Sequence, residues 1–400
     1  MIRMASVEQA LALLAEHGRA AAMGVETVPL AQAEGRRLAE AVVAQVSQPP
    51  ADVSAMDGYA VKFADMKMGA ALKVIGESRA GTPSGLRLGT GEAVRIFTGA
   101  YVPEGADHIL IQEDAKREGD TVTVTFEQRK PENIRRAGLD FLRGQTLVPA
   151  GHVMTEGAIS LAAAGNAASV AVRKRPRIGV LANGDELMPP GSALGPGQIV
   201  NSIQPALLAL IRRWGAEPIN LGAARDDQAD VIKRISQPCD VLVTIGGASV
   251  GDHDVVRSAF ANAGFTPVFE KIAVKPGKPT WFSKRAPQLV LGLPGNPAAA
   301  MVTAQLFLRP LVDALMSTPP SAQATQRAHT NQALPATANR EEYLRAILAI
   351  GADGRAGVTA AENQDSSLLS PFLTANVLIR RAPNAPAVAA GDLVDIVVLA

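Results

Sequence analysis

Residues 176 to 316 alternate short apolar runs with longer helix-forming runs, and this alternation constrains the fold more than any other feature. The predicted strands are "RIGVLAN", "PINLG", "VLVTI", "VFEKIAV" and "QLVLGL". Between and after them lie helical patterns, the last being "PAAAMVTAQLFLRPLVDALM". Strands joined by helices of this length predict a parallel sheet that is covered on both faces.

The remainder of the chain has a different pattern of predicted secondary structure. Residues 1–45 are predicted to be helical and then extended, whereas residues 50–140 carry short strands and Gly-rich turns typical of a small β domain. Short strands return over residues 330–400. Four hundred residues exceed one ordinary core. The predicted fold class is therefore α/β plus β, in several domains.

Composition excludes several classes of protein. A hydrophobic content of 47% indicates a globular chain, and Lys+Arg 39 against Asp+Glu 38 argues against nucleic-acid binding through bulk charge. The single cysteine, Cys239, excludes an internal disulfide and fits a reducing compartment. The segment "MIRMASVEQALALLAEHG" is an acidic amphipathic helix rather than a signal peptide, and no apolar run approaches the roughly 18 residues of a membrane span. We expect a cytoplasmic protein that does not associate with membranes.

Each predicted strand of the α/β region ends in a loop of unusual chemistry. Ligands of open α/β sheets bind outside the carboxyl ends of the strands, so these five loops should converge on one edge. In chain order they are Gly184-Asp185-Glu186, Arg225-Asp226-Asp227, Gly246-Gly247-Ala248-Ser249, Lys275-Pro276-Gly277-Lys278 and Pro294-Gly295-Asn296-Pro297.

The residue types in these loops indicate an anionic ligand with a metal. Glycines, here Gly246, Gly247 and Gly251, let backbone N–H groups approach an anion. Lys275 and Lys278 add positive charge. Carboxylates are hard ligands that suit Mg²⁺. The candidate carboxylates are Glu186, Asp226, Asp252 and Asp254. Together these groups describe a nucleotide or pyrophosphate with its metal.

The first half contains a second group of candidates. "SAMDGYAV" is a turn with Asp57 at its tip, although a plain Asp-Gly turn would explain it equally well. "RIFTGAYVPEGAD" places Thr98 after a strand, and "ENIRRAGLD" sets Arg135, Arg136 and Asp140 close together.

These motifs occur in the order found in a known family. "AMDGYAV", "TGAYVPEGAD", "ENIRRAGLD", "NGDEL", "GQIVNS", "GGASVGDHD", "VKPGKP" and "LPGNP" resemble those of the MoeA family, the molybdopterin molybdenumtransferases, which are related to the E domain of gephyrin. The resemblance covers nearly the whole chain. It implies a discontinuous N-terminal linker domain (1–48 and 141–175), an inserted β-rich domain carrying "MDGYA" (49–140), a MoaB/MogA-like molybdopterin-binding α/β domain (176–318) and a β-barrel-like C-terminal domain (325–400).

The resemblance also implies an activity. Such a transferase inserts molybdenum from molybdate into adenylylated molybdopterin and releases AMP in a Mg²⁺-dependent step. The family is homodimeric, and its site lies between the α/β domain of one subunit and the "MDGYA" domain of the other. Transient contacts with the molybdopterin adenylyltransferase and with apo-molybdoenzymes are expected.

Residue roles carry over from the family by motif. The catalytic set implied is Asp57, Glu186, Asp226, Asp254, Lys271, Lys275 and Lys278. The substrate-binding set implied is Thr98, Arg135, Asp140, Gly246, Gly247, Ser249, Gly251, Pro294, Pro297, Arg345 and Ser366. The metal ligands implied are Asp254, Glu186 and Asp252.

Three details qualify these roles. "GDHD" offers two acids where one is expected; Asp252 fits a helix N-cap and Asp254 is the better candidate for the site, but their division of roles stays open. Lys271 and Lys275 would share one face if the chain between them alternates as a strand. Ala182-Asn183 stands where relatives often have Ser or Thr, which changes hydrogen-bonding groups but removes no charge.

Two other functions compete with this one. A molybdopterin adenylyltransferase would use a similar α/β domain, but it usually lacks the "MDGYA" and C-terminal β domains. A non-catalytic dimeric scaffold is disfavoured because acids and lysines are present at every loop.

Overall fold

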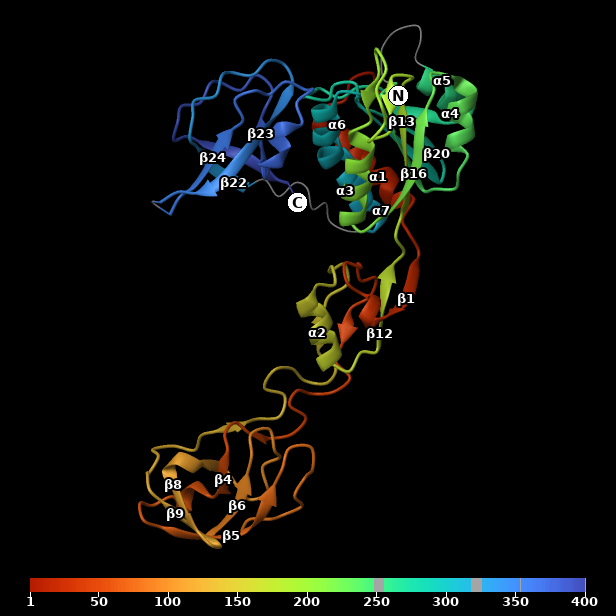
Figure 1. Cartoon of the computed structure of the whole chain (residues 1–400). Helices are drawn as coiled ribbons and strands as arrows, with labels where there is room; N and C mark the ends of the chain where they lie inside the picture. Colours follow the sequence, from red (N-terminus) through yellow and green to blue (C-terminus); the bar gives the residue numbers. More distant parts are fainter. Residues whose placement is uncertain (248–254, 318–325, 353, 400) are drawn as a thin grey trace. The chain divides into compact units, whose positions relative to one another are not determined.

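The computed structural model describes all of the 400 residues except 248–254, 318–325, 353 and 400 (Figure 1). The chain divides into two compact units. One comprises Met1–Glu26 with Arg173–Ala400, and the other comprises Thr27–Val172.

A six-stranded sheet forms the centre of the first unit, in the order β16-β13-β17-β21-β20-β18. The strands are β13 (Arg177–Asn183), β16 (Glu217–Ala224), β17 (Val241–Ile245), β18 (Thr266–Phe269), β20 (Trp281–Arg285) and β21 (Gln288–Leu293). The first four in this order are parallel, as predicted. β20 is antiparallel to both β21 and β18, so the sheet is mixed. The sequence prediction missed β20; only Ala286 and Pro287 join it to β21, and so short a loop connects only antiparallel neighbours.

Helices cover both faces of this sheet, as predicted. Side chains along β17 alternate between the two faces of the sheet, so that Val243 packs into one apolar cluster and Leu242 packs into another on the opposite face. Both faces are therefore apolar and are buried by helices. The first cluster includes α1 (Val7–Ala20), α3 (Ile203–Arg213), α6 (Pro297–Thr303), the π-helical turn η4 (Ala304–Leu308) and α7 (Arg309–Leu315). The second includes α4 (Gln228–Ile235) and α5 (Val255–Asn262).

Helix α1 belongs with the α/β part, not with the linker domain to which residues 1–48 were assigned. Val7, Ala10 and Leu14 of this helix are buried in the first cluster, and Leu11 and Leu13 pack against it. A Cβ built at Gly18 would lie 2.7 Å from the Cβ of Ala314 in α7, so only glycine permits this close helix contact. An amphipathic pattern predicts that a helix is covered on one face but does not name the surface that covers it.

The helical run Pro297–Leu315 is long and apolar enough, by length and composition alone, to cross a membrane, and 89% of it is buried in the described structure. This differs from the expectation that no apolar run reaches that length. Packing in the protein core accounts for its apolar composition.

The C-terminal part of the first unit is a closed five-stranded barrel. Its strands are β22 (Gln326–Thr330), β23 (Glu341–Ile350), β24 (Ala356–Ala360), β25 (Val377–Arg381) and β26 (Leu393–Val398). Pairing runs β23-β24-β22-β26-β25 and closes between β25 and β23. The short strand β19 (Val274–Lys275) pairs with β23. The predicted single strand "VFEKIAV" is therefore two strands, β18 and β19, which lie in different sheets.

The second unit contains helix α2 (Glu156–Ala164) and mostly short strands. Six strands form one sheet, in the order β7-β4-β6-β5-β9-β8. They are β4 (Gly58–Val61), β5 (Ala71–Ser78), β6 (Glu92–Ile96), β7 (His108–Ile111), β8 (Ala115–Glu118) and β9 (Thr121–Val124). The two-residue strands β3 (Val53–Ser54) and β10 (Ile134–Arg135) pair, as do β2 (Val42–Val43) with β11 (Thr146–Val148) and β1 (Val25–Pro29) with β12 (Ser169–Arg173).

Candidate active site

Loops at the carboxyl ends of β13, β17 and β21 meet at one edge of the α/β sheet, where they line a cavity of about 520 Å³. Two of these loops touch through backbone, since a Cβ built on Gly295 would lie 3.5 Å from the Cα of Gly246. The cavity is lined by Asn183, Glu186, Leu187, Ile199, Val200, Asn201, Ser202, Ile203, Ile245, Gly246, Gly247, Pro279, Pro294, Gly295, Asn296 and Pro297.

The glycine turn after β17 is required by geometry. Gly246 and Gly247 have φ values of +83° and +63°, which disfavour other residues. A Cβ on Gly247 would lie 2.2 Å from Cγ2 of Val256, inside van der Waals distance. The chain can therefore turn tightly beside the cavity only with glycine here. The candidates that follow, Ser249, Gly251, Asp252 and Asp254, lie outside the described residues.

Of the four candidate carboxylates in the loops of the α/β sheet, two are described, Glu186 and Asp226, and they have different surroundings. Glu186 is exposed and lines the cavity. Asp226 does not line it; its Oδ1 accepts a hydrogen bond from Nδ2 of Asn183 at 2.7 Å, and its N–H donates to Oδ1 of Asp185 at 3.2 Å. Asp226 therefore orients Asn183, a residue that was noted in the sequence but was not chosen for the site.

The described part of the chain holds no group of three or more His, Cys, Asp or Glu side chains arranged to bind a metal ion. Mg²⁺ in phosphate-handling sites commonly takes one or two carboxylates together with substrate oxygens and water. Glu186, which lines the cavity, fits such a partial ligand set, and the other two predicted ligands are not among the described residues.

A second cavity, of about 400 Å³, adjoins the first and shares Pro279, Pro294 and Asn296 with it. It is lined by three cationic residues, Lys275, Lys278 and Arg340, and by two acids, Glu342 and Asp365. The Nζ of Lys275 lies 3.2 Å from Oε1 of Glu342. The sequence reasoning overlooked Arg340, which follows no strand of the α/β sheet. An excess of positive charge over a small volume is suited to an oxyanion.

Lys271 lines neither cavity. The strand alternation expected to place Lys271 beside Lys275 does not apply, because β18 ends at Phe269 and β19 begins only at Val274. The backbone carbonyl of Lys271 instead accepts the N–H of Ala5.

Arg345 was predicted to bind substrate, but the structure buries it behind the cavity, with 1% of its surface exposed. Its guanidinium donates to the carbonyl oxygens of Leu368 at 2.7 Å and Asp365 at 3.0 Å, and to Oε1 of Gln364 at 3.2 Å. Burial lowers the pKa of this guanidinium, but an arginine stays charged. Arg345 therefore positions the segment that carries Ser366, which does line the second cavity.

In the second unit, Asp57 and Thr98 lie together. Oδ1 of Asp57 accepts hydrogen bonds from the backbone N–H of Thr98 at 2.7 Å and from its Oγ1 at 2.8 Å. These two bonds, with a smaller contribution from Arg95, hold the pKa of Asp57 below its ordinary value of 3.8. The next residue must be glycine, because a Cβ on Gly58 would lie 2.0 Å from the carbonyl oxygen of Leu110. The turn thus presents an ionised carboxylate in a fixed orientation.

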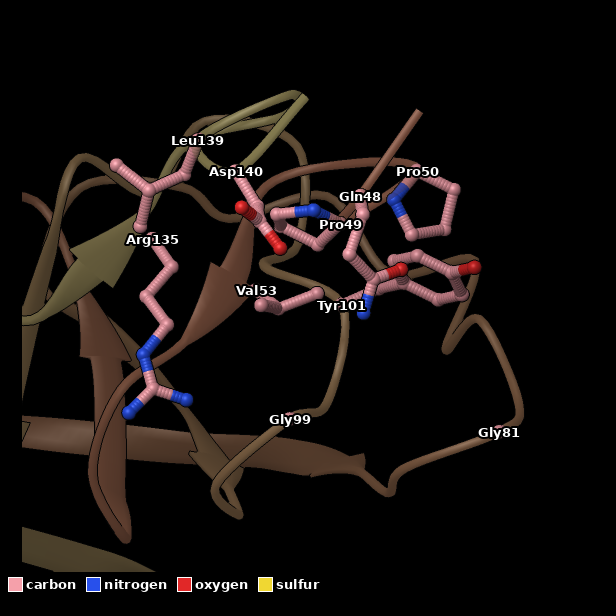
Figure 2. Close-up of a pocket in the computed structure, with 10 residues that line it drawn as sticks. All are labelled: Gln48, Pro49, Pro50, Val53, Gly81, Gly99, Tyr101, Arg135, Leu139 and Asp140. Carbon is pink, nitrogen blue, oxygen red and sulfur yellow. The ribbon is translucent and has the colours of Figure 1, made fainter. Parts of the chain in front are cut away.

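Arg135 and Asp140 line a third cavity, of about 420 Å³, also within the second unit. Figure 2 shows both side chains on one side of this cavity, with Tyr101 and Pro50 on the other. Arg136, which the sequence placed beside them, instead pairs with Asp52 at 2.6 Å. Gly99, the residue after Thr98, also lines the cavity.

A glycine-lined cleft next to a cationic cavity, at the carboxyl edge of an α/β sheet, is chemically suited to a phosphorylated or otherwise anionic ligand. Comparison with known families makes this specific. Residues 5–165 match the MoeA N-terminal region (domain I and II), residues 179–314 match a probable molybdopterin binding domain, and residues 327–399 match the MoeA C-terminal region (domain IV).

Similar proteins span nearly the whole chain. A molybdopterin molybdenumtransferase of Haemophilus influenzae is 34% identical over 381 residues, covering 93% of each chain. Molybdopterin molybdenumtransferase 2 of Mycobacterium tuberculosis is 34% identical, covering 92% of this chain and 94% of its own. A crystal structure of a molybdopterin biosynthesis MoeA protein from Pyrococcus horikoshii superimposes with a TM-score of 0.81 at 25% identity, covering 99% of this chain and 100% of that one. The chain therefore belongs to the MoeA family, and it is a transferase of molybdenum cofactor biosynthesis.

Proposed function

We propose that this transferase inserts molybdenum from molybdate into adenylylated molybdopterin and releases AMP, with Mg²⁺ as cofactor. The observation that supports this proposal is the pair of adjoining cavities at the sheet edge, one lined by glycine backbone and the other by three cationic residues. One cavity suits an extended phosphorylated ligand and the other a small oxyanion, so both substrates would lie next to each other.

Catalysis in this proposal is mainly electrostatic. Lys275, Lys278 and Arg340 concentrate molybdate beside the pterin, and Glu342 holds Lys275 in place across 3.2 Å. The glycine turn at Gly246 and Gly247 lies against the phosphoanhydride. Mg²⁺, when bound by Glu186 with Asp252 or Asp254 and by the substrate's phosphate oxygens, would neutralise the charge of the anhydride. No protein nucleophile is needed.

We further propose that the protein acts as a homodimer in which Asp57 of one copy serves the cleft of the other, as the resemblance implies. Both hydrogen bonds from Thr98 fall on Oδ1 of Asp57, which leaves Oδ2 for the substrate. Mixing Asp57→Ala protein with Lys275→Ala protein under conditions that exchange subunits should restore part of the activity. If the mixture stays inactive although mixed dimers form, the shared site is refuted.

The proposed setting is the cytoplasm. The expected partners are the two substrates, the adenylyltransferase that supplies adenylylated molybdopterin, and the apo-molybdoenzymes that take the product. Neither nucleic acid nor membrane is expected as a partner.

The direct test mixes purified protein with adenylylated molybdopterin, Mg²⁺ and molybdate, and follows AMP release and pterin-bound molybdenum together. We expect molybdate-dependent release of AMP with metal incorporated. Lys275→Ala and Asp254→Ala should abolish insertion while the proteins stay folded. Lys233→Ala, an exposed lysine on α4, is the matched control and should retain activity.

Two results would contradict the proposal. One is an unchanged insertion rate in either site variant. The other is inactivity with this substrate combined with formation of pyrophosphate from ATP and free molybdopterin, which would identify the protein as the adenylyltransferase.

A further inference from the structure

The side-chain amide of Asn183, at the end of β13, is held in one orientation. One of its two polar atoms lies 2.7 Å from Oδ1 of Asp226. The carboxyl oxygen of Asp226 is the acceptor and the amide nitrogen of Asn183, Nδ2, is the donor. The carbonyl oxygen, Oδ1, is then the atom that is turned away from Asp226.

Oδ1 of Asn183 is buried and receives no hydrogen bond from any residue that the structure describes. The residue as a whole is 7% exposed. Buried polar atoms in folded proteins are nearly always paired, because an unmet acceptor away from water costs free energy. An acceptor without a partner beside a cavity therefore indicates a ligand that donates a hydrogen bond.

Asn183 lines the cavity of about 520 Å³, and part of the remaining wall is aliphatic. Leu187 of β14 (Leu187–Met188) and Ile199 and Val200 of β15 (Ile199–Val200) line the same cavity. Ile199 is 53% exposed and Val200 is 39% exposed, although both are apolar. Four other polar side chains also line the cavity: Glu186, Asn201, Ser202 and Asn296. Among the described lining residues, Oδ1 of Asn183 is the one buried side-chain polar atom that lacks a partner. An apolar surface next to an acceptor of fixed orientation is complementary to a planar heterocycle that carries an amino group on its edge.

We propose that Asn183 is a specificity-determining residue, and that its Oδ1 accepts a hydrogen bond from an exocyclic amino group of the bound heterocycle. This inference rests on the proposed function for its choice of ligand. Adenylylated molybdopterin carries such a group on the pterin and another on the adenine. Asp226 is then a positioning residue, which fixes the amide so that only a donor is accepted.

The test compares ligands that differ at the amino group. Pterin is compared with lumazine, in which an oxo group replaces the 2-amino group, and AMP is compared with IMP, in which an oxo group replaces the 6-amino group. Binding is measured by pterin fluorescence and by calorimetry. Wild-type protein should bind the amino member of at least one pair about tenfold more tightly, because an oxo group would face a buried acceptor.

Asn183→Leu keeps the size of the side chain and removes the acceptor, so we expect the preference to fall to about one. Ile199→Ala is the matched control: it removes an aliphatic wall, and should weaken both members of a pair alike and leave their ratio unchanged. If Asn183→Leu does not fold, Asn183→Thr replaces it, since a threonine hydroxyl cannot reach the position of Oδ1 and the preference should again be lost.

If Asn183→Leu loses the preference for pterin over lumazine, Oδ1 of Asn183 contacts the pterin. If it loses the preference for AMP over IMP, Oδ1 contacts the adenine. The inference is overturned if wild-type protein shows no preference in either pair, or if the preference survives in Asn183→Leu. Because these assays contain no molybdate, they are independent of the insertion assay. A wild-type protein that inserts molybdenum but shows no preference refutes the role of Asn183 alone, whereas preference without insertion refutes the proposed function.

Discussion

Nδ2 of Asn296 donates a hydrogen bond to Oγ of Ser366 at 2.9 Å. The carbonyl oxygen of Ser366 also accepts the N–H of Ala298, again at 2.9 Å. Ser366 thus joins the loop before α6 to a segment that follows β24 of the barrel. Both Asn296 and Ser366 line the cationic cavity, so its shape depends on this contact.

A double-mutant cycle measures that contact. Ser366→Ala and Asn296→Ala each remove the side-chain hydrogen bond but leave the backbone one. We expect a coupling of about 1 kcal/mol in the free energy of unfolding, typical of one net hydrogen bond. Chemical denaturation of the four proteins gives the value, and strict additivity would show that the contact contributes nothing.

Arg345→Lys should destabilise the protein by roughly 3 kcal/mol. A lysine has the charge but not the forked donors that reach Leu368, Asp365 and Gln364, so buried acceptors lose their partners. Arg327→Lys is the control, because this exposed arginine on β22 only approaches Asp395, at 3.7 Å, and its change should cost less than about 0.5 kcal/mol. Equal effects in the two variants would refute the positioning role of Arg345.

Gly247→Ala should lower the free energy of unfolding by about 2 to 4 kcal/mol. Its positive φ and the clash with Val256 both oppose a Cβ. Gly264→Ala is the control for backbone strain, because Gly264 has a φ of +86° but its nearest contact to a Cβ would be an ordinary 3.7 Å. It should cost about 1 kcal/mol. Thermal or chemical unfolding gives the free energy of unfolding of both variants, and the difference between their losses measures the clash with Val256. Equal losses would contradict the predicted clash.

Asp57 should titrate below its ordinary pKa of 3.8, because the N–H and hydroxyl of Thr98 favour the carboxylate. A depressed pKa means that the associated stabilisation is complete above pH 3.8 and is lost as the pH falls through the lower, folded-state pKa. Thr98→Val removes the hydroxyl donor and should move the titration midpoint upward. Carbon NMR of the Asp57 carboxyl group measures both midpoints, and an unchanged value in the variant would contradict this account.

His108 should make the second unit less stable at mildly acidic pH. Burial lowers its pKa below 6.5, and its Nδ1 accepts the N–H of Glu132 at 2.9 Å, which requires the neutral ring. The unfolded chain therefore binds the proton more readily, and stability falls as the pH drops below 6.5. His108→Gln keeps an acceptor but cannot titrate, so it should lose less stability between pH 7 and pH 5. Unfolding curves of the wild-type and His108→Gln proteins at pH 7 and pH 5 measure this difference in stability.

The sequence alone predicted most of the α/β domain, because periodicity and glycine turns are local signals. The apolar runs of β13, β17 and β21 and the glycines after β17 could be read directly, and so could the convergence of their loops. The family motifs, which the comparisons confirmed, supplied the activity. Asp57 and Thr98, 41 residues apart, were both chosen by motif, and the structure brings them into contact.

Tertiary structure decided what depends on partners distant in sequence. Only packing shows that α1 lies against α7, that β19 leaves the α/β sheet to pair with β23, and that β20 turns back to make the sheet mixed. Only packing buries Arg345 behind Ser366 and leaves Oδ1 of Asn183 turned away from Asp226. The physical reason is common to all of these. Chain pattern determines which faces must be buried and where the chain can turn, whereas the neighbour that buries a face or meets a polar atom depends on contacts between segments far apart in sequence.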